Sequence, residues 1–247
     1  MSMETNQGSA QYVMVAPNAG SHNSIYRGKN LGTAVTDEQY AAIAAGTFDD
    51  LFIGDYWVID GVNYRIAAFN YYLHCGETEE CTANHVVIVP DRALCDARMN
   101  PTSSTEGGYV GSEMYKEGLK PAIAMVKAAF SGHVLTHQLF LSTGTTNGHR
   151  STGEWLDREV DLLCEHMVYG SGIFSPVSDG TLIPIYQVEK GQLPLFFFAP
   201  ELIATRTSWW LRDVISATDF ARICRYGLAD YGDGSSARGI RPVFCIR

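Results

Sequence analysis

Hydrophobic residues recur at helical spacing soon after the polar N-terminal stretch of the chain. Thr36 is followed three residues later by Gln39, which is the capping-box pattern at the start of a helix. Ile43 lies on the apolar face of this segment, and Gly46 stands where a left-handed glycine commonly ends a helix. The pattern therefore predicts a helix over residues 36–46.

The next apolar runs have the character of strands. Residues 56–59 (YWVI) and 62–66 (VNYRI) are rich in β-branched and aromatic side chains, and Asp60 and Gly61 separate them. Two such runs around an Asp-Gly dipeptide are a strong short-range signal for a β-hairpin. The run HVVIV at residues 85–89 is continuously apolar and predicts a buried strand.

The middle of the chain has a helical pattern with interruptions. Residues 111–130 are broken by Gly118 and Pro121, so we expect two short helices there. A third helix is expected over residues 154–166, because apolar side chains recur near helical spacing at Trp155, Val160, Leu163 and Met167.

Strand-like runs dominate the last third of the chain and set the expected fold class. They lie at residues 182–188, 193–198, 208–212, 221–225 and 241–246. A hairpin and strand, then helices, then several strands is an α+β order rather than regular βαβ alternation. We therefore expect an α+β domain with short strands, few helices and long loops.

The domain organisation follows from length and polarity. Residues 1–24 are small and polar, with one short apolar patch at Tyr12–Val15, so we expect an N-terminal attachment arm that is ordered by a partner. Residues 25–247 are expected to form one domain, with a candidate ligand-binding segment at residues 214–240.

Charge divides the chain into two unequal parts. The net charge is −9, which argues against nucleic acid as a partner, because phosphate binding needs a basic surface. The segment from Arg206 to the end is different: it has seven Arg, no Lys and four Asp. We expect Arg212 and Arg241 to serve the structure, and the other arginines mark the region where a partner is sought first.

Membrane insertion and secretion are not expected. The most apolar run, residues 193–199, is far shorter than the ~20 residues that span a bilayer. Residues 1–20 lack the apolar core of a signal peptide.

The strongest metal-like pattern is the group His74, Cys75, Cys81 and His85. These are zinc-ligand types, but the spacing differs from common zinc knuckles and no second ligand pair matches it. Free cysteines are the default interpretation, and a zinc site or a Cys75–Cys81 bridge remains as an alternative.

Catalytic motifs give no positive signal. The chain lacks G-x-S-x-G, H-E-x-x-H, a P-loop and G-x-G-x-x-G, and its segment 230–236 lacks the order of an EF-hand loop. We therefore expect no enzyme, no catalytic residue, no metal and no cofactor.

The candidate site lies between two apolar runs near the C-terminus, residues 209–211 and 242–246. Tyr and Arg provide contact energy in recognition surfaces, and Ser adapts to a partner. The alternative is an ordinary polar loop that closes a sheet. The candidate receptor-binding residues are Arg222, Arg225, Tyr226, Asp230, Tyr231, Asp233, Ser235, Ser236 and Arg238.

Two stretches resemble a known family. YRGKNLG at residues 26–32, with GTFDDLFIGDYWVIDGVNYRIAAFNYYL at residues 46–73, resembles tail- or head-fibre-type structural proteins of phages and prophages of gut bacteria. Residues 210–213 through 239–245 resemble the closing half of the same domain. This ending is also similar to the variable proteins of diversity-generating retroelements, which implies a C-type-lectin-like fold and places residues 219–238 at the displayed, diversified segment.

The resemblance implies a phage virion protein of fibre or tip type. Its C-terminal loops would bind a host surface protein or glycan, its arm would contact other virion proteins, and the chain would form a homotrimer. A purely structural virion decoration or attachment protein without a receptor is the first alternative. A zinc- or cysteine-dependent enzyme is the second.

Overall fold

A computed structural model describes residues 18–77, 80–175 and 191–247. It has a mixed α and β fold, about 22% helix and 35% strand, with sheets that are not closed. The expected α and β content is thereby confirmed. Among the described residues, no helix is long and apolar enough to cross a lipid bilayer.

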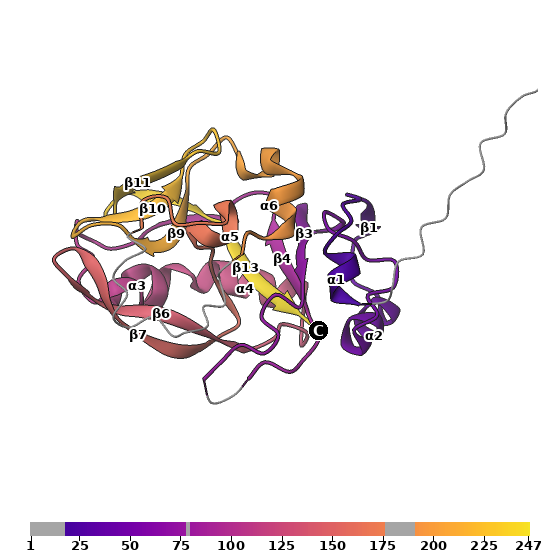
Figure 1. Cartoon of the computed structure of the whole chain (residues 1–247). Helices are drawn as coiled ribbons and strands as arrows, with labels where there is room; N and C mark the ends of the chain where they lie inside the picture. The colour runs from indigo at the N-terminus through magenta and orange to yellow at the C-terminus, as the bar shows by residue number, and fades with distance from the viewer. Residues whose placement is uncertain (1–17, 78–79, 176–190) are drawn as a thin grey trace, which may run out of the picture.

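Three sheets organise the described residues (Figure 1). The six-stranded sheet has the order β1 (Asn30–Gly32), β2 (Tyr56–Ile59), β3 (Val62–Phe69), β4 (Val86–Pro90), β13 (Pro242–Ile246) and β8 (Val160–Leu162). The five-stranded sheet has the order β11 (Ala229–Asp233), β10 (Asp219–Ile223), β9 (Trp209–Val214), β12 (Ala237–Ile240) and β5 (Cys95–Arg98). The third sheet is the hairpin of β6 (His137–Thr146) and β7 (His149–Arg158).

Short helices connect and cover these sheets (Figure 1). They are α1 (Ala19–His22), α2 (Asp37–Ala45), α3 (Gly108–Gly111), the π-helix η1 (Met114–Gly118), α4 (Lys120–Ala129), α5 (Glu165–Tyr169), α6 (Pro194–Phe198) and the 3₁₀ helix η2 (Pro200–Ile203).

The predictions that rested on local signals are confirmed. Helix α2 has the expected capping box between Thr36 and Gln39, and Gly46 ends it in the left-handed conformation. The β2–β3 hairpin turns through Asp60 and Gly61, with φ values of 50° and 72°, as a type I′ turn requires.

The strand and helices of the middle region are also confirmed. β4 is the expected buried strand, and the segment 111–130 contains two short helices, η1 and α4. η1 ends at Gly118 and Pro121 lies in the first turn of α4, where the missing N–H of proline costs nothing.

The helix predicted over residues 154–166 is wrong. This segment contains the end of β7 and all of β8, and a helix begins only at Glu165. Trp155 pairs across the hairpin with Phe140, at 5.6 Å between ring centroids, and Val160 pairs with Phe244 of β13. These distant partners satisfy the backbone of an extended segment, so tertiary pairing overrides the apparent helical spacing.

The strand predicted over residues 193–198 is also wrong, because Pro194–Phe198 form α6. Pro194 occupies the first turn, where its fixed φ favours a helix. Leu195 and Phe196 are buried while Phe197 faces solvent, a pattern that one turn of helix produces. The strand predicted at residues 182–188 lies outside the described residues.

The later strands are confirmed with small shifts of their ends. The runs 208–212, 221–225 and 241–246 correspond to β9, β10 and β13. β13 lies between β4 and β8, so the C-terminal strand is inside the six-stranded sheet.

The folded body includes part of the expected arm. His22 is buried and its Nδ1 lies 2.6 Å from the carbonyl oxygen of Leu51. The Asn23 side chain donates to the backbone of Phe69 and accepts from it. Residues 18–24 therefore belong to the body rather than to an arm, and residues 1–17 lie outside the described residues.

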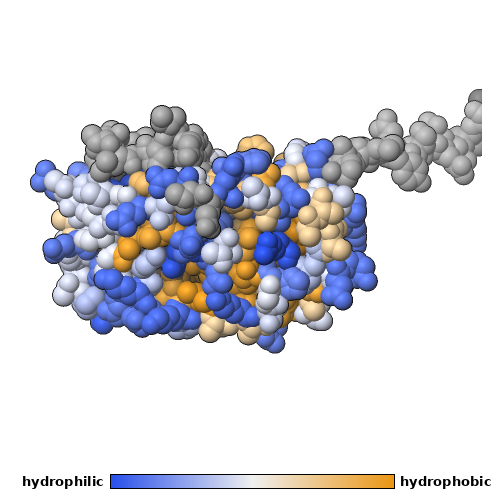
Figure 2. Space-filling view, turned by 90° about the horizontal axis from the view of Figure 1, so that it is seen from below, coloured by the Kyte–Doolittle hydropathy of each residue, from blue (hydrophilic) through white to orange (hydrophobic). Residues whose placement is uncertain are grey.

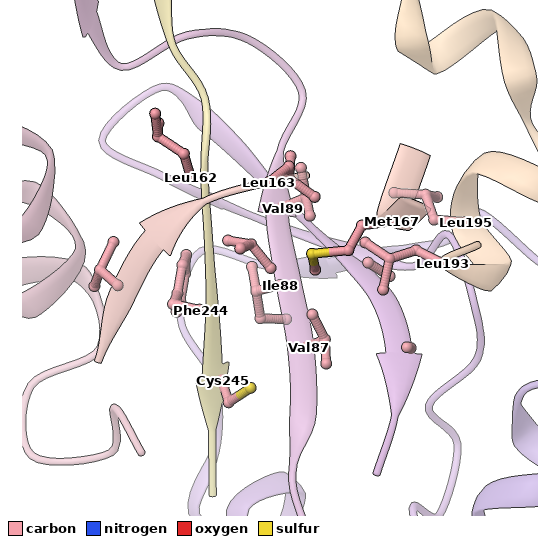
Figure 3. Close-up of a cluster of buried hydrophobic side chains, with 14 of the residues drawn as sticks. Val87, Ile88, Val89, Leu162, Leu163, Met167, Leu193, Leu195, Phe244 and Cys245 are labelled. Atoms are coloured by element: carbon pink, nitrogen blue, oxygen red, sulfur yellow. The ribbon is translucent and has the colours of Figure 1, made fainter. Parts of the chain in front are cut away.

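The core is centred on β4 and β13 (Figure 3). Val87, Ile88 and Val89 on β4 lie beside Phe244 and Cys245 on β13, and all five are buried. Figure 3 also shows that α5, α6 and their connections contribute Met167, Leu193 and Leu195 to the cluster. Burying each such aliphatic side chain contributes about 1.5–3 kcal/mol.

Hydrophobic residues also lie on the surface of the molecule. Seen from below, hydrophobic residues gather in the middle of the face and hydrophilic ones surround them (Figure 2). More than half of the accessible surface of a folded protein is apolar, so this face by itself indicates no binding site.

Candidate recognition surface

The predicted receptor-binding residues lie along β10, β11, β12 and the two turns between them. β10 and β11 are antiparallel, so the turn before β11 and the turn after it lie at opposite ends of the five-stranded sheet. Five strand residues separate them, which corresponds to roughly 16 Å. The nine predicted residues therefore do not form one continuous site.

The turn at residues 224–228, here called the recognition turn, projects two large apolar side chains into solvent. Tyr226 and Leu228 are each 67% exposed. The guanidinium carbon of Arg225 lies 4.6 Å from the centroid of the Tyr226 ring, and Arg225 also donates a hydrogen bond to the Tyr226 hydroxyl. One cationic, one aromatic and one aliphatic side chain thus face solvent together.

The backbone of the recognition turn is firmly held despite this exposure. Cys224 N donates to Leu228 O and Gly227 N donates to Cys224 O, both at 2.9 Å. From α5, the hydroxyl of Tyr169 donates to Gly227 O at 3.0 Å. Gly227 has φ of 85°, and an added Cβ there would lie 3.1 Å from Ala204, so any other residue would be strained at this position.

Leu228 was not among the residues predicted from the sequence. Its only signal is an apolar residue directly after the turn glycine, and such residues are usually buried. Its exposure depends on the position of the turn, which Tyr169 of α5 holds through its hydrogen bond to Gly227 O.

Arg222 and Asp230 form an ion pair that joins β10 to β11. Arg222 Nη2 lies 2.8 Å from Asp230 Oδ2, and Arg222 Nε donates to the same oxygen at 3.0 Å. The two residues are direct cross-strand partners. Their charges neutralise each other within the hairpin, which leaves little for a partner.

Tyr231 lies on the other face of β11 and is 47% exposed. Its ring meets the ring of Phe174 edge to face, with centroids 5.1 Å apart. The loop that carries Phe174 is held by the buried carboxylate of Glu165, which accepts hydrogen bonds from the backbone N–H groups of Ile173, Phe174 and Ser175.

A second carboxylate lies near Glu165. Asp213 Oδ2 accepts from the backbone N–H of Glu165 at 2.8 Å. Burial, and then the negative charge of Glu165, raise the pKa of Asp213 to about 7. These two carboxylates support the loop behind Tyr231.

At the other end of β11, the polar groups of the turn form hydrogen bonds with one another and with a neighbouring loop. Asp233 accepts from the hydroxyl of Ser103 and from the backbone N–H of Ser235, and these bonds lower its pKa. Ser236 N donates to Asp233 O. Arg238 on β12 is half-buried and donates to Ala237 O. This end is therefore a polar turn that closes the sheet.

The structural role expected for Arg212 and Arg241 is confirmed. Both are buried; Arg212 donates to Leu162 O, and Arg241 donates to Pro90 O and Leu202 O. Two of the seven arginines in the basic C-terminal segment are thus withdrawn from the surface.

The candidate zinc ligands are not arranged as a metal centre. His85 Nε2 accepts from Tyr72 N, and His85 Nδ1 lies 2.9 Å from Ala83 O, so neighbouring backbone groups use both ring nitrogens. Burial lowers the pKa of His85 to about 4. Within residues 18–77, 80–175 and 191–247, no group of three or more His, Cys, Asp or Glu side chains has the geometry to hold a metal ion.

No family model, no curated protein and no solved structure matches this chain.

Proposed function

We propose that this chain is a phage virion-associated protein of fibre or tip type that binds a host-cell receptor through its recognition turn. Receptor binding is supported by Tyr226 and Leu228, which are both two-thirds exposed on a turn held by three hydrogen bonds. The virion part rests on the sequence resemblance at residues 26–32, 46–73, 210–213 and 239–245.

The recognition turn is pre-organised for binding. Large apolar side chains on a rigid backbone lose little conformational entropy when a partner covers them. Tyr and Arg are the residue types that most often provide the binding energy of an interface. The adjacent Arg225 adds a positive charge on a chain of net charge −9. The expected partner is therefore a host protein or a glycan with negative charge, or a host protein with exposed aromatic side chains.

The five-stranded sheet and its long loops are compatible with the proposed C-type-lectin-like fold. In that fold, a displayed segment lies between fixed strands, and here the recognition turn lies between β10 and β11. A single site of this size is small, so useful binding strength would come from several copies on one particle, such as a homotrimer.

The direct test is binding of the labelled full chain to a panel of gut bacteria, measured by flow cytometry. On a strain that the wild type binds, the double variant Tyr226→Ala, Leu228→Ala should bind with an apparent affinity at least about tenfold lower. The matched control is Ser235→Ala, Ser236→Ala in the opposite turn, which should bind as the wild type does. Equal binding by the wild type and the Tyr226/Leu228 variant would rule out this receptor site.

A second function is favoured by a different exposed surface. Phe197 on α6 is 68% exposed, and Tyr26 and Phe198 beside it are 41% and 39% exposed. The rings of Tyr26 and Phe198 lie 6.5 Å apart. An apolar group of this kind suits contact with another virion protein, so a purely structural role is the alternative. Under that role, particles assembled with Phe197→Ser would lack the protein, while the Tyr226/Leu228 variant would be incorporated and adsorb normally.

A further inference from the structure

The loop between β3 and β4 places two cysteines opposite each other. Cys81 N donates to Cys75 O at 2.9 Å, and His74 N donates to Cys81 O at 2.8 Å. Two consecutive residues, His74 and Cys75, thus face the single residue Cys81, which is the hydrogen-bond pattern of a β-bulge. His74 has φ of 65°, the left-handed conformation that the first position adopts in the G1 class of bulge.

This backbone arrangement holds the two cysteines next to each other. One hydrogen bond, from Cys81 N to Cys75 O at 2.9 Å, joins their backbones, while Cys75 N donates to Tyr72 O at 3.1 Å. Backbones in such contact are near enough for the usual Cα separation of a disulfide, about 4.4–6.8 Å. Cys75 and Cys81 are thiols in the structure, and their sulfurs contact the carbonyl oxygens of Leu73 at 3.7 Å and Ala83 at 3.9 Å. A thiol is a weak hydrogen-bond donor, so these contacts cost little to break.

Exposure gives the two thiols different roles. Cys75 is half-buried beside His74 and Glu80, whose side chains are 67% and 53% exposed. Cys81 is buried, and its sulfur lies 3.9 Å from His85 Nδ1. A soluble oxidant therefore reaches Cys75 first, and Cys81 is the resolving thiol.

We propose that Cys75 and Cys81 are a modification site, at which a disulfide oxidant such as glutathione disulfide joins them in a reversible bond. In the first step, the Cys75 thiolate attacks glutathione disulfide, which gives a Cys75–glutathione mixed disulfide and one glutathione. In the second, the Cys81 thiolate displaces the other glutathione and forms the Cys75–Cys81 bond. Two protein thiols are oxidised, one glutathione disulfide is reduced to two glutathiones, and the thiol protons pass through solvent to the leaving thiolates.

The bond would close a loop that already contacts the body. Glu77 N donates to the Gln138 side chain of β6 at 2.9 Å, and His74 Nδ1 lies 2.6 Å from Glu80 Oε1. A bond between Cys75 and Cys81 would hold these two contacts together. This inference is independent of the receptor proposal, since the recognition turn lies on another sheet.

The test is mass spectrometry of the full chain after incubation with glutathione disulfide, followed by alkylation in denaturant. The reduced protein should take up six alkyl groups and the oxidised protein four. Cleavage after the glutamates between the two cysteines should leave the fragments that carry Cys75 and Cys81 joined until a reductant is added. The variant Cys81→Ser should keep glutathione on Cys75, and the control Cys95→Ser should form the bond as the wild type does.

Three results would overturn the proposal. The first is full alkylation of all six cysteines after oxidation. The second is a bond that joins Cys81 to Cys245, the buried cysteine of β13 whose pKa is raised by burial and then by Cys81. The third is zinc bound to the purified chain in a one-to-one ratio and lost in the Cys81→Ser variant, which would assign these thiols to a metal instead.

Discussion

Arg222 and Asp230 face each other across β10 and β11, and their side chains form an ion pair with 2.8 Å between Arg222 Nη2 and Asp230 Oδ2. The pair lies in the middle of the segment that the sequence indicates as a recognition surface. It shows that charged residues of one short segment divide into two kinds: those that hold the sheet and those that face solvent.

Replacing Arg222 with Ala should weaken the sheet slightly and leave recognition intact. Both side chains are partly exposed, at 21% and 35%, so solvent screening limits the effect on the free energy of unfolding to about 0.5 kcal/mol. Urea denaturation measures this effect. The matched control is Arg225→Ala, which should leave stability unchanged. A loss of receptor binding in Arg222→Ala without loss of stability would contradict the structural role.

The Glu165 carboxylate should be necessary for the loop that carries Phe174. In Glu165→Gln the charge is lost and one acceptor oxygen becomes a donor, so the N–H groups of Ile173, Phe174 and Ser175 lose charge-assisted partners. We expect a loss of about 1–3 kcal/mol in the free energy of unfolding. Amide hydrogen exchange at residues 173–175 should become faster, and unchanged exchange would show that other contacts hold the loop.

The same variant should change the titration of Asp213. Burial comes first among the causes that raise the pKa of Asp213 to about 7, and the charge of Glu165 comes second. Removing that charge should lower the pKa of Asp213 and leave it above its ordinary value of 3.8. Carboxyl NMR signals followed against pH measure this change. A pKa that stays near 7 in Glu165→Gln would assign the shift to burial alone.

Two buried histidines should make the fold sensitive to acid. Burial lowers the pKa of His85 to about 4 and that of His137 to about 3. In the unfolded chain each takes up a proton near pH 6.5, whereas the folded chain resists this until the lower pKa. Above about pH 6.5 the two histidines therefore cost the folded state nothing. As the pH drops from 6.5 toward 4, the free energy of unfolding falls by up to about 1.4 kcal/mol per pH unit for each histidine.

Unfolding midpoints between pH 4 and pH 8 check this expectation. The variant His137→Phe should show a weaker fall below pH 6.5 than the wild type. The control His149→Phe changes an exposed histidine and should follow the wild-type curve. Parallel curves for all three proteins would show that His137 does not contribute to the acid response.

Arg241 should be required for stability and not for binding. It is fully buried, donates to Pro90 O and Leu202 O, and its guanidinium carbon lies 5.0 Å from the Trp209 ring centroid. Arg241→Met leaves a buried carbonyl oxygen of Pro90 and a partly buried one of Leu202 without these donors, at a cost of about 2–5 kcal/mol. Thermal denaturation measures it, with Arg238→Met on the neighbouring strand as the control. An equal midpoint for both variants would contradict the structural role of Arg241.

Local signals were enough for some elements and not for others. The capping box of α2 and the Asp-Gly turn of the β2–β3 hairpin each depend on contacts within a few residues, and both are present as predicted. The predictions for residues 154–158 and 193–198 are wrong for different reasons. Residues 154–158 form a strand because of partners 15 or more positions away, such as Phe140 opposite Trp155. Residues 193–198 contain a helix because Pro194 occupies its first turn and the apolar run buries Leu195 and Phe196.

The sequence by itself determined which residue types the C-terminal segment offers, where its bounding strands lie and that its charge differs from the body. The tertiary structure alone decided which of those residues face solvent. Antiparallel pairing of β10 and β11 sent Tyr226 and Asp233 to opposite ends of the sheet and turned Arg222 toward Asp230. The reason is physical: composition is a property of the chain, whereas exposure depends on hydrogen-bonded register and on packing against distant segments such as α5.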